Sequence, residues 1–118
     1  MKERLFLAVS TFPNVETARK ISRELVDSAL VACANIVPSV QSIYRWDEKV
    51  ECSAESLVIF KMTAARFSTF ESRLRELHPY DVPEIIGLNI EEGSADYLRW
   101  IGESCSDSSP RASVEESR

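Results

Sequence analysis

The residues best suited to chemistry in this chain lie in one short segment, which runs from His78 to Ile86. It holds the only histidine of the protein, together with Tyr80, Asp81 and Glu84. Imidazole nitrogens and carboxylate oxygens bind divalent transition metals, and a protein site generally uses three or more such donors. His78 and Glu84 are therefore the candidate metal ligands. Because the segment has no thiol, a complete site would need donors from a neighbouring chain.

Both candidate ligands also have a structural interpretation. His78 follows a predicted helix, where a cationic side chain can bind the last free carbonyl groups and complement the helix dipole. Glu84 could accept hydrogen bonds from backbone N–H groups, or pair with Lys61 or Arg45 across a subunit boundary. For His78 the pattern favours the cap, whereas for Glu84 the two interpretations stay open.

A second set of candidate residues is aromatic. Tyr44, Trp46 and Tyr80 could line a cleft between subunits, since aromatic side chains supply contact area at a small cost in entropy. Lys61 ends an apolar run and could bind an anion or a carboxylate in the same intersubunit cleft. The alternatives are interface core for the three aromatic residues, and for Lys61 an ammonium group that reaches solvent at the sheet edge.

Catalytic patterns are missing from the sequence. It has no glycine-rich phosphate loop and no GxSxG, HExxH or EF-hand pattern. The single histidine would have to activate a serine or cysteine that the sequence does not place beside it. We therefore expect no enzyme, no catalytic residues and no cofactor-binding residues. An acylphosphatase-type hydrolase, which shares the predicted topology, lacks the phosphate cradle that it would need.

The composition indicates one globular domain in a reducing compartment. The 118 residues are 44% hydrophobic and carry a net charge of −5, which argues against nucleic acid or an anionic membrane as the main partner. The three cysteines show no CxxC spacing, so a disulfide framework is not expected. No apolar run has the length of a membrane span, and no signal peptide is evident. We expect a soluble, cytoplasmic protein.

The elements that position these residues follow from hydrophobic periodicity and from breakers. Two prolines, Pro79 and Pro83, fix a corner that ends a helix at about His78. Pro38 and Ser39 predict a bulge, because proline cannot donate to a central strand ladder. The predicted strands span about residues 5–9, 32–46, 50–62 and 85–90; the predicted helices span about 15–29, 63–78 and 95–101; residues 47–49 form a hairpin turn.

This order, β-α-β-β-α-β with a last helix, is the α+β ferredoxin-like pattern of two helices on an antiparallel four-stranded sheet. Residues 1–102 form the predicted domain, and the serine-rich residues 103–118 a flexible tail. The hairpin is longer than so small a domain needs, so its exposed edges favour pairing with other copies of the chain in a ring.

Five motifs resemble the CutA family, the divalent-cation-tolerance proteins: VACANIVP at 31–38, SIYRW at 42–46, FKMT at 60–63, HPYDVPEII at 78–86 and YLRWI at 97–101. The resemblance covers about residues 5–101. It implies a ferredoxin-like subunit in a tight homotrimer whose hairpins form intersubunit sheets. It also implies a role in the tolerance of divalent metals such as copper.

The sequence departs from the family at the implied metal site. Bacterial members discussed as copper binders carry a cysteine where this chain has Ser10, and a His-His pair where it has Leu77 and His78. Two of the three implied ligands are thus absent. We therefore expect a trimeric CutA-like protein that responds to divalent copper and binds it weakly. The alternative is a regulatory trimer of PII-like type that binds a small molecule in its intersubunit clefts.

Overall fold

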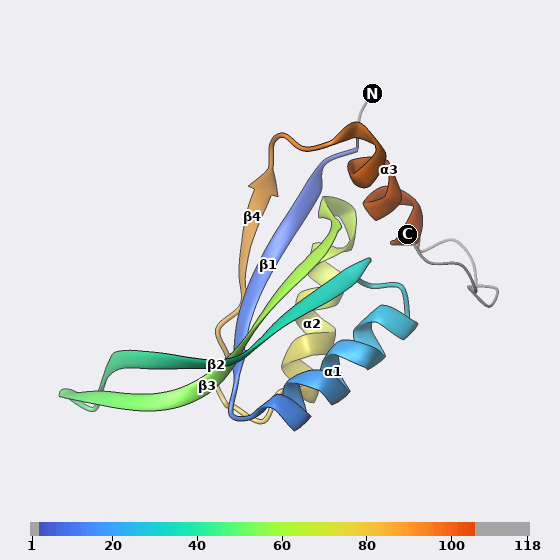
Figure 1. Ribbon diagram of the computed structural model, residues 1–118. Coiled ribbons are helices and arrows are strands. Elements are labelled where there is room, and N and C mark those ends of the chain that lie inside the picture. The colour runs from blue at the N-terminus through green and yellow to red at the C-terminus, as the bar shows by residue number, and fades with distance from the viewer. Residues whose placement is uncertain (1–2, 106–118) are drawn as a thin grey trace.

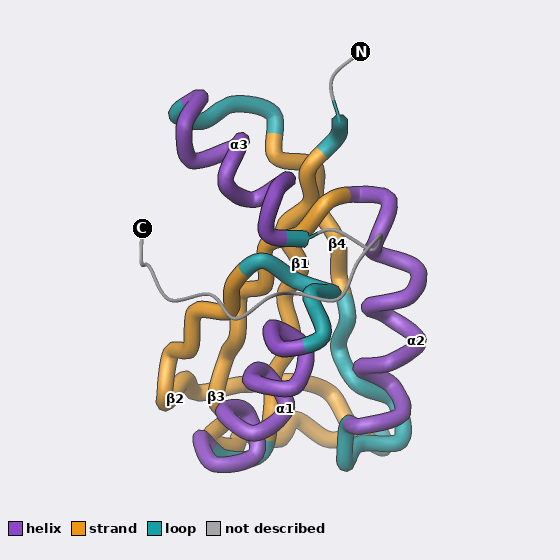
Figure 2. Tube along the Cα trace, turned by 90° about the vertical axis from the view of Figure 1, so that its right-hand side faces the viewer, coloured by secondary structure: helices purple, strands orange, loops and turns teal. Residues whose placement is uncertain are grey.

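The computed structural model describes residues 3–105 and contains the predicted order of elements (Figure 1). A four-stranded antiparallel sheet carries two helices on one face, and a third helix lies across one end of the other face (Figure 2). The elements are β1 (Leu5–Phe12), α1 (Val15–Asp27), β2 (Cys33–Trp46), β3 (Lys49–Thr63), a 3₁₀ turn (Ala64–Arg66), α2 (Phe67–Leu77), β4 (Ile86–Ile90) and α3 (Ala95–Ser104).

The sheet has the strand order β2-β3-β1-β4, which is that of the predicted ferredoxin-like fold. Side chains alternate between its two faces. The face under α1 and α2 is fully buried at Ala8, Phe12 and Phe60, and Phe60 packs on Phe70 of α2 with ring centroids 5.1 Å apart. The core of the protein therefore lies between the sheet and these two helices.

Helix α1 forms for the reasons that its sequence indicates. The side chain of Asn14 caps it by accepting a hydrogen bond of 2.8 Å from the Thr17 N–H. Its buried stripe includes Ala18, Ile21 and Leu25. The helix ends at Asp27, two residues before the predicted end, because the backbone turns into the left-handed region at Ala29, where φ is 62°.

The long β2–β3 hairpin contains the predicted bulge. Its register shifts between Val37 and Val40, and the Ser56 hydroxyl donates a hydrogen bond of 2.7 Å to the Pro38 carbonyl. Beyond the bulge the two strands leave the body of the protein as a ribbon (Figure 1). The turn is shorter than predicted, since Asp47 and Glu48 alone form it, with φ values of 56° and 66°.

The last helix is three residues longer than its predicted range, 95–101. Helix α3 continues through Ser104, and the buried Cys105 donates a hydrogen bond of 3.1 Å from its thiol to the Leu30 carbonyl. This contact joins residues far apart in the sequence, and local composition does not reveal it. The rest of the predicted flexible tail, 106–118, lies outside the described residues. No helix within residues 3–105 is long and apolar enough to cross a membrane.

Candidate functional site

The segment from His78 to Glu84 forms the predicted rigid corner between α2 and β4. Helix α2 ends at Leu77, and His78 takes an extended conformation with φ −75° and ψ 137°. Pro79 and Pro83 fix the backbone of the connection. Strand β4 begins at Ile86, slightly later than predicted. The corner sets the side chains that follow His78 beside the base of the β2–β3 hairpin.

His78 is almost fully buried, with 7% of its surface exposed. Its Nδ1 accepts a hydrogen bond of 3.1 Å from the Tyr80 backbone N–H, so Nε2 carries the proton and donates 2.8 Å to the Thr11 carbonyl. The ring stacks on Phe12 with centroids 4.6 Å apart. Burial lowers the pKa of His78, and the Thr11 bond and the charge of Glu55 offset this only in part.

The predicted capping role of His78 is therefore wrong in its partner. The side chain does not bind the carbonyls at the end of α2; it binds Thr11 at the end of β1. Only the backbone N–H of His78 closes the helix, by donating 2.9 Å to the Leu74 carbonyl. The imidazole thus fixes the corner to the sheet in its neutral form, and both ring nitrogens already have protein partners.

Tyr80 connects the corner to the hairpin. Its hydroxyl donates a hydrogen bond of 2.7 Å to the Glu55 carboxylate on β3. Burial, followed by this hydrogen bond and the negative charge of Glu55, raises the pKa of Tyr80 well above its usual value. Tyr80 is therefore a neutral donor at physiological pH and holds Glu55 in one position.

An open pocket of about 860 Å³ lies between the hairpin ribbon and the corner. Tyr44, Trp46, Tyr80 and Glu84 all line it, so four of the six predicted site residues come together within a single chain. Asp81, which the sequence places in the same segment as Glu84, also lines the pocket. Two further acidic residues of the lining, Glu51 and Glu55, were not predicted from the sequence. The alternating pattern of β3 could have shown that Glu51 and Glu55 share a face, but only the register places Glu51 opposite Tyr44.

Lys61 does not line this pocket, and its predicted place in a cleft between subunits stays a prediction. It is opposite Cys33 in the register, and its Nζ donates 3.3 Å to the Tyr97 hydroxyl of α3. The same ammonium group is 5.3 Å from the centroid of the Tyr97 ring. Among the ion pairs of residues 3–105, none joins Glu84 to Lys61 or to Arg45.

The described residues offer no preformed metal centre. No group of three or more His, Cys, Asp or Glu side chains within residues 3–105 could hold a metal ion. Ser10, where the resemblance implies a cysteine, is fully buried on the face of the sheet under the helices. The metal roles of His78 and Glu84 stay predictions. For His78, a metal could bind Nδ1 only after the Tyr80 N–H had moved away.

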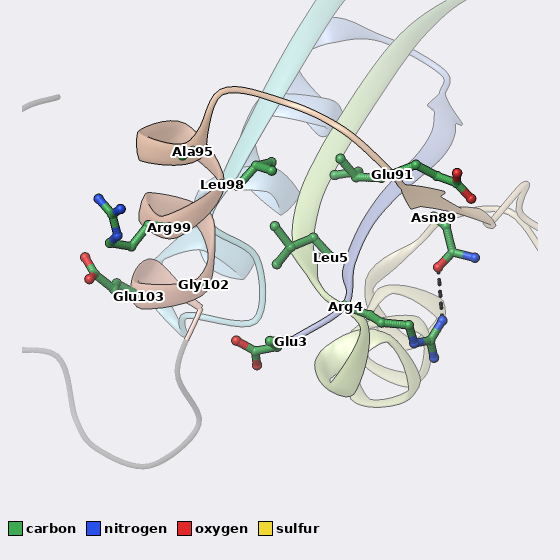
Figure 3. Close-up of a pocket in the computed structure, with 11 residues that line it drawn as sticks. Glu3, Arg4, Leu5, Asn89, Glu91, Ala95, Leu98, Arg99, Gly102 and Glu103 are labelled. Carbon is green, nitrogen blue, oxygen red and sulfur yellow. Dashed lines mark hydrogen bonds between the residues drawn. The ribbon is translucent and has the colours of Figure 1, made fainter. Parts of the chain in front are cut away.

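A second pocket, of about 770 Å³, lies at the opposite end of the sheet between β1, β4 and α3 (Figure 3). The Arg4 side chain donates 3.0 Å to Asn89 at its rim. Leu5 and Leu98 contribute apolar surface, and the surrounding charges are of both signs. None of the predicted site residues lines this second pocket. Its charged residues are both acidic and basic, whereas those of the pocket between the hairpin and the corner are all acidic.

Fold and site together define a class: a small ferredoxin-like α+β protein with an extended hairpin and an aromatic, acidic pocket between this hairpin and the corner. Residues 6–104 match the family model described as "CutA1 divalent ion tolerance protein", and the chain belongs to this family.

Relatives and solved structures agree with this assignment. The chain is 46% identical over 93 residues to the "Divalent-cation tolerance protein CutA" of Thermus thermophilus, covering 79% of this chain and 90% of the relative. It is 38% identical over 104 residues to human "Protein CutA", covering 86% of this chain but 58% of the human protein. The structure of CutA1 from Oryza sativa superposes with a TM-score of 0.86 at 34% identity, covering 90% of this chain and 97% of that chain.

Proposed function

We propose that this protein acts in the tolerance of divalent metal ions, copper among them, as a homotrimer that catalyses no reaction. The observation that carries the proposal is the family match over residues 6–104, supported by the Thermus relative that is named for divalent-cation tolerance. Since residues 3–105 contain no three-donor cluster, the proposed metal binding is weak and uses donors from more than one chain. The candidate donors of this chain are Glu84, which is exposed, and His78, which is buried.

The proposed trimer is supported by apolar surface that a single chain leaves exposed. Ile86 and Leu88 on β4 are each 50% exposed, on the sheet face opposite α1 and α2. On the hairpin ribbon, Ile43, Trp46 and Val50 are between 64% and 69% exposed. Exposed apolar strands at sheet edges are normally covered, and a closed ring of identical chains would cover them all at once.

The proposed compartment is the cytoplasm, because all three thiols are free. Related proteins carry other compartments in their names, including a chloroplastic protein of Arabidopsis thaliana and a periplasmic one of Archaeoglobus fulgidus. Fractionation of cells that express this chain tests the point. Recovery in a periplasmic or organellar fraction would contradict it.

The metal function is tested by growth. A copper-sensitive bacterial host that expresses the chain should grow at higher Cu²⁺ concentrations than the same host with an empty vector. Titration of the purified protein with Cu²⁺ should show weak binding that Glu84→Gln reduces. Equal growth of the two strains, with the protein present on an immunoblot, would refute the proposal.

A second candidate function is a regulatory trimer that binds a small organic molecule. The observation that favours it is the pocket between the hairpin ribbon and the corner, whose volume and aromatic lining are those of small-molecule sites. Its ligand would bind directly to the side chains that line this pocket, and no metal ion would be needed.

A further inference from the structure

The ribbon of the β2–β3 hairpin, residues 40–55, joins the rest of the subunit through a narrow base (Figure 1). Strand β1 pairs with β3 only as far as Ser56, so within residues 3–105 no third strand lies beside the ribbon. The bulge between Val37 and Val40 is at the same level of the hairpin. A bulge bends its strand, and a two-stranded ribbon alone is marginally stable in water. The base of the ribbon therefore acts as a hinge.

One side chain outside the ribbon restrains it. Among the hydrogen bonds and ion pairs of the described residues, the one that connects a ribbon side chain to the rest of the subunit is the 2.7 Å bond from the Tyr80 hydroxyl to the Glu55 carboxylate. Glu55 is the ribbon residue next to Ser56, so the bond is made beside the hinge. Both side chains are partly buried, and a bond to a carboxylate is stronger than one between neutral groups.

Tyr80 is itself held firmly by the body of the protein. Its backbone N–H donates 3.1 Å to Nδ1 of His78, and the two rings lie with centroids 4.8 Å apart. The buried His78 ring is bound in turn to the carbonyl of Thr11, at the end of β1. The position of Glu55 is thus set, through Tyr80 and His78, by the central part of the sheet.

A restraint at the base controls the position of the distant tip. Strands rise about 3.3 Å per residue, so the turn at Asp47 is about 25 Å from Glu55. A small tilt at the base becomes a large displacement at the tip, where Ile43, Trp46 and Val50 expose apolar surface. A surface that is already in its bound position loses less entropy when a partner docks.

We propose that the Tyr80–Glu55 hydrogen bond is a strap that holds the ribbon at one angle to the sheet, and thereby prepares it to dock against other copies of the chain. Tyr80 is a positioning residue in this role, since it acts through the ribbon. The inference rests on the homotrimer proposed above and adds the device that sets its docking surface. Without the strap, only a fraction of the folded chains would present the ribbon correctly, and assembly would weaken by that fraction.

Sedimentation velocity over a dilution series tests the effect on assembly. Tyr80→Phe and Glu55→Met each remove the strap, and each trimer should dissociate at an about three- to tenfold higher chain concentration than the wild type. The matched controls are Tyr44→Phe and Glu51→Met, which change the same residue types on the ribbon but leave the Tyr80–Glu55 bond in place. Both controls should dissociate as the wild type does.

Residual dipolar couplings of backbone amides test the restraint directly. They are measured in chains that also carry Leu88→Lys, a charge on the exposed sheet face that keeps the copies apart. Adding Tyr80→Phe should reduce the couplings of residues 43–52, because the ribbon then samples several angles, and leave those of β1 unchanged. A general loss of stability would not produce this selective change.

The possible outcomes separate the strap from the trimer. Ribbon couplings that stay the same in Tyr80→Phe would refute the strap. A freed ribbon with an unchanged dissociation concentration would refute its role in assembly, as would equal weakening by the two control variants. A wild type that is monomeric at every concentration would refute the proposed trimer, and the dipolar couplings would still decide whether the strap exists.

Discussion

At the scale of single residues, His78 illustrates how burial changes the meaning of a side chain. Its type predicts a metal ligand or a helix cap, yet its two nitrogens bind Thr11 and the Tyr80 N–H. The Thr11 partner is not recognisable from local sequence, because it lies on another element, 67 residues away. The imidazole acts here as a neutral, two-sided hydrogen-bonding group that connects three segments of the chain.

His78 should make stability depend on pH. Its pKa in the folded protein lies below that of an unfolded histidine, about 6.5, so the unfolded chain binds the proton more tightly. Stability should be complete above this value and fall as the pH drops through and below it. Urea unfolding of the wild type should shift to lower midpoints between pH 7.5 and 5.5.

The matched variant for this test is His78→Gln, which keeps an N–H donor but does not titrate. It should be less stable by about 1–2 kcal/mol at pH 7.5, from the lost stacking and one weakened hydrogen bond. Its midpoint should fall less than that of the wild type as the pH is lowered. Parallel pH profiles for the two proteins would contradict the assignment of a buried neutral imidazole.

Removing one hydroxyl should separate the corner from the hairpin. In Tyr80→Phe the Glu55 carboxylate loses its 2.7 Å donor, and we expect a loss of about 1–2 kcal/mol in the free energy of unfolding. Tyr44→Phe is the control, because the Tyr44 hydroxyl makes only a 3.4 Å contact with Ser53 and should matter little. Combining Tyr80→Phe with Glu55→Gln should cost less than the sum of the two changes. Additive costs would mean that the two side chains act independently.

At the scale of elements, the parts predictable from sequence are those determined locally. The apolar stripe of α1, the bulge at Pro38 and the corner at Pro79 follow from periodicity and proline geometry. The parts that were missed depend on contacts between distant segments. The extension of α3 depends on Cys105 meeting Leu30, and the partner of the His78 side chain depends on Thr11 lying beside it.

The hairpin turn is an element whose sequence is not optimal for its geometry. Asp47 and Glu48 both have positive φ, a conformation that turns of this kind usually assign to Asn-Gly or Asp-Gly. Glu48→Gly should therefore stabilise the protein by about 1 kcal/mol in urea unfolding at a fixed protein concentration. Glu51→Gly, placed within β3, should instead destabilise it by about 0.5–1 kcal/mol. A Glu48→Gly variant no more stable than the wild type would show that the turn carries no strain.

At the scale of the whole molecule, two surfaces of the chain stay largely exposed to solvent: the sheet face opposite α1 and α2, and the ribbon of the β2–β3 hairpin. Helix α3 covers only one end of the face opposite α1 and α2, where Lys61 meets Tyr97. The remainder exposes Ile86 and Leu88, and the ribbon of the hairpin extends from the body (Figure 1). A single chain thus resembles one part of a larger assembly.

The proposed trimer should depend on this face and not on exposed apolar surface in general. Wild-type protein at micromolar concentration should have the mass of three chains by light scattering. Leu88→Lys places a charge on the uncovered face, where burial of an unpaired ammonium group is costly, and should convert the trimer to monomers. Val26→Lys changes an apolar side chain on α1 that is 37% exposed, on the other side of the sheet, and should leave the mass unchanged.

Circular dichroism of both variants shows whether the subunit still folds. A monomeric wild type, or a folded Leu88→Lys variant that stays trimeric, would refute this face as the interface.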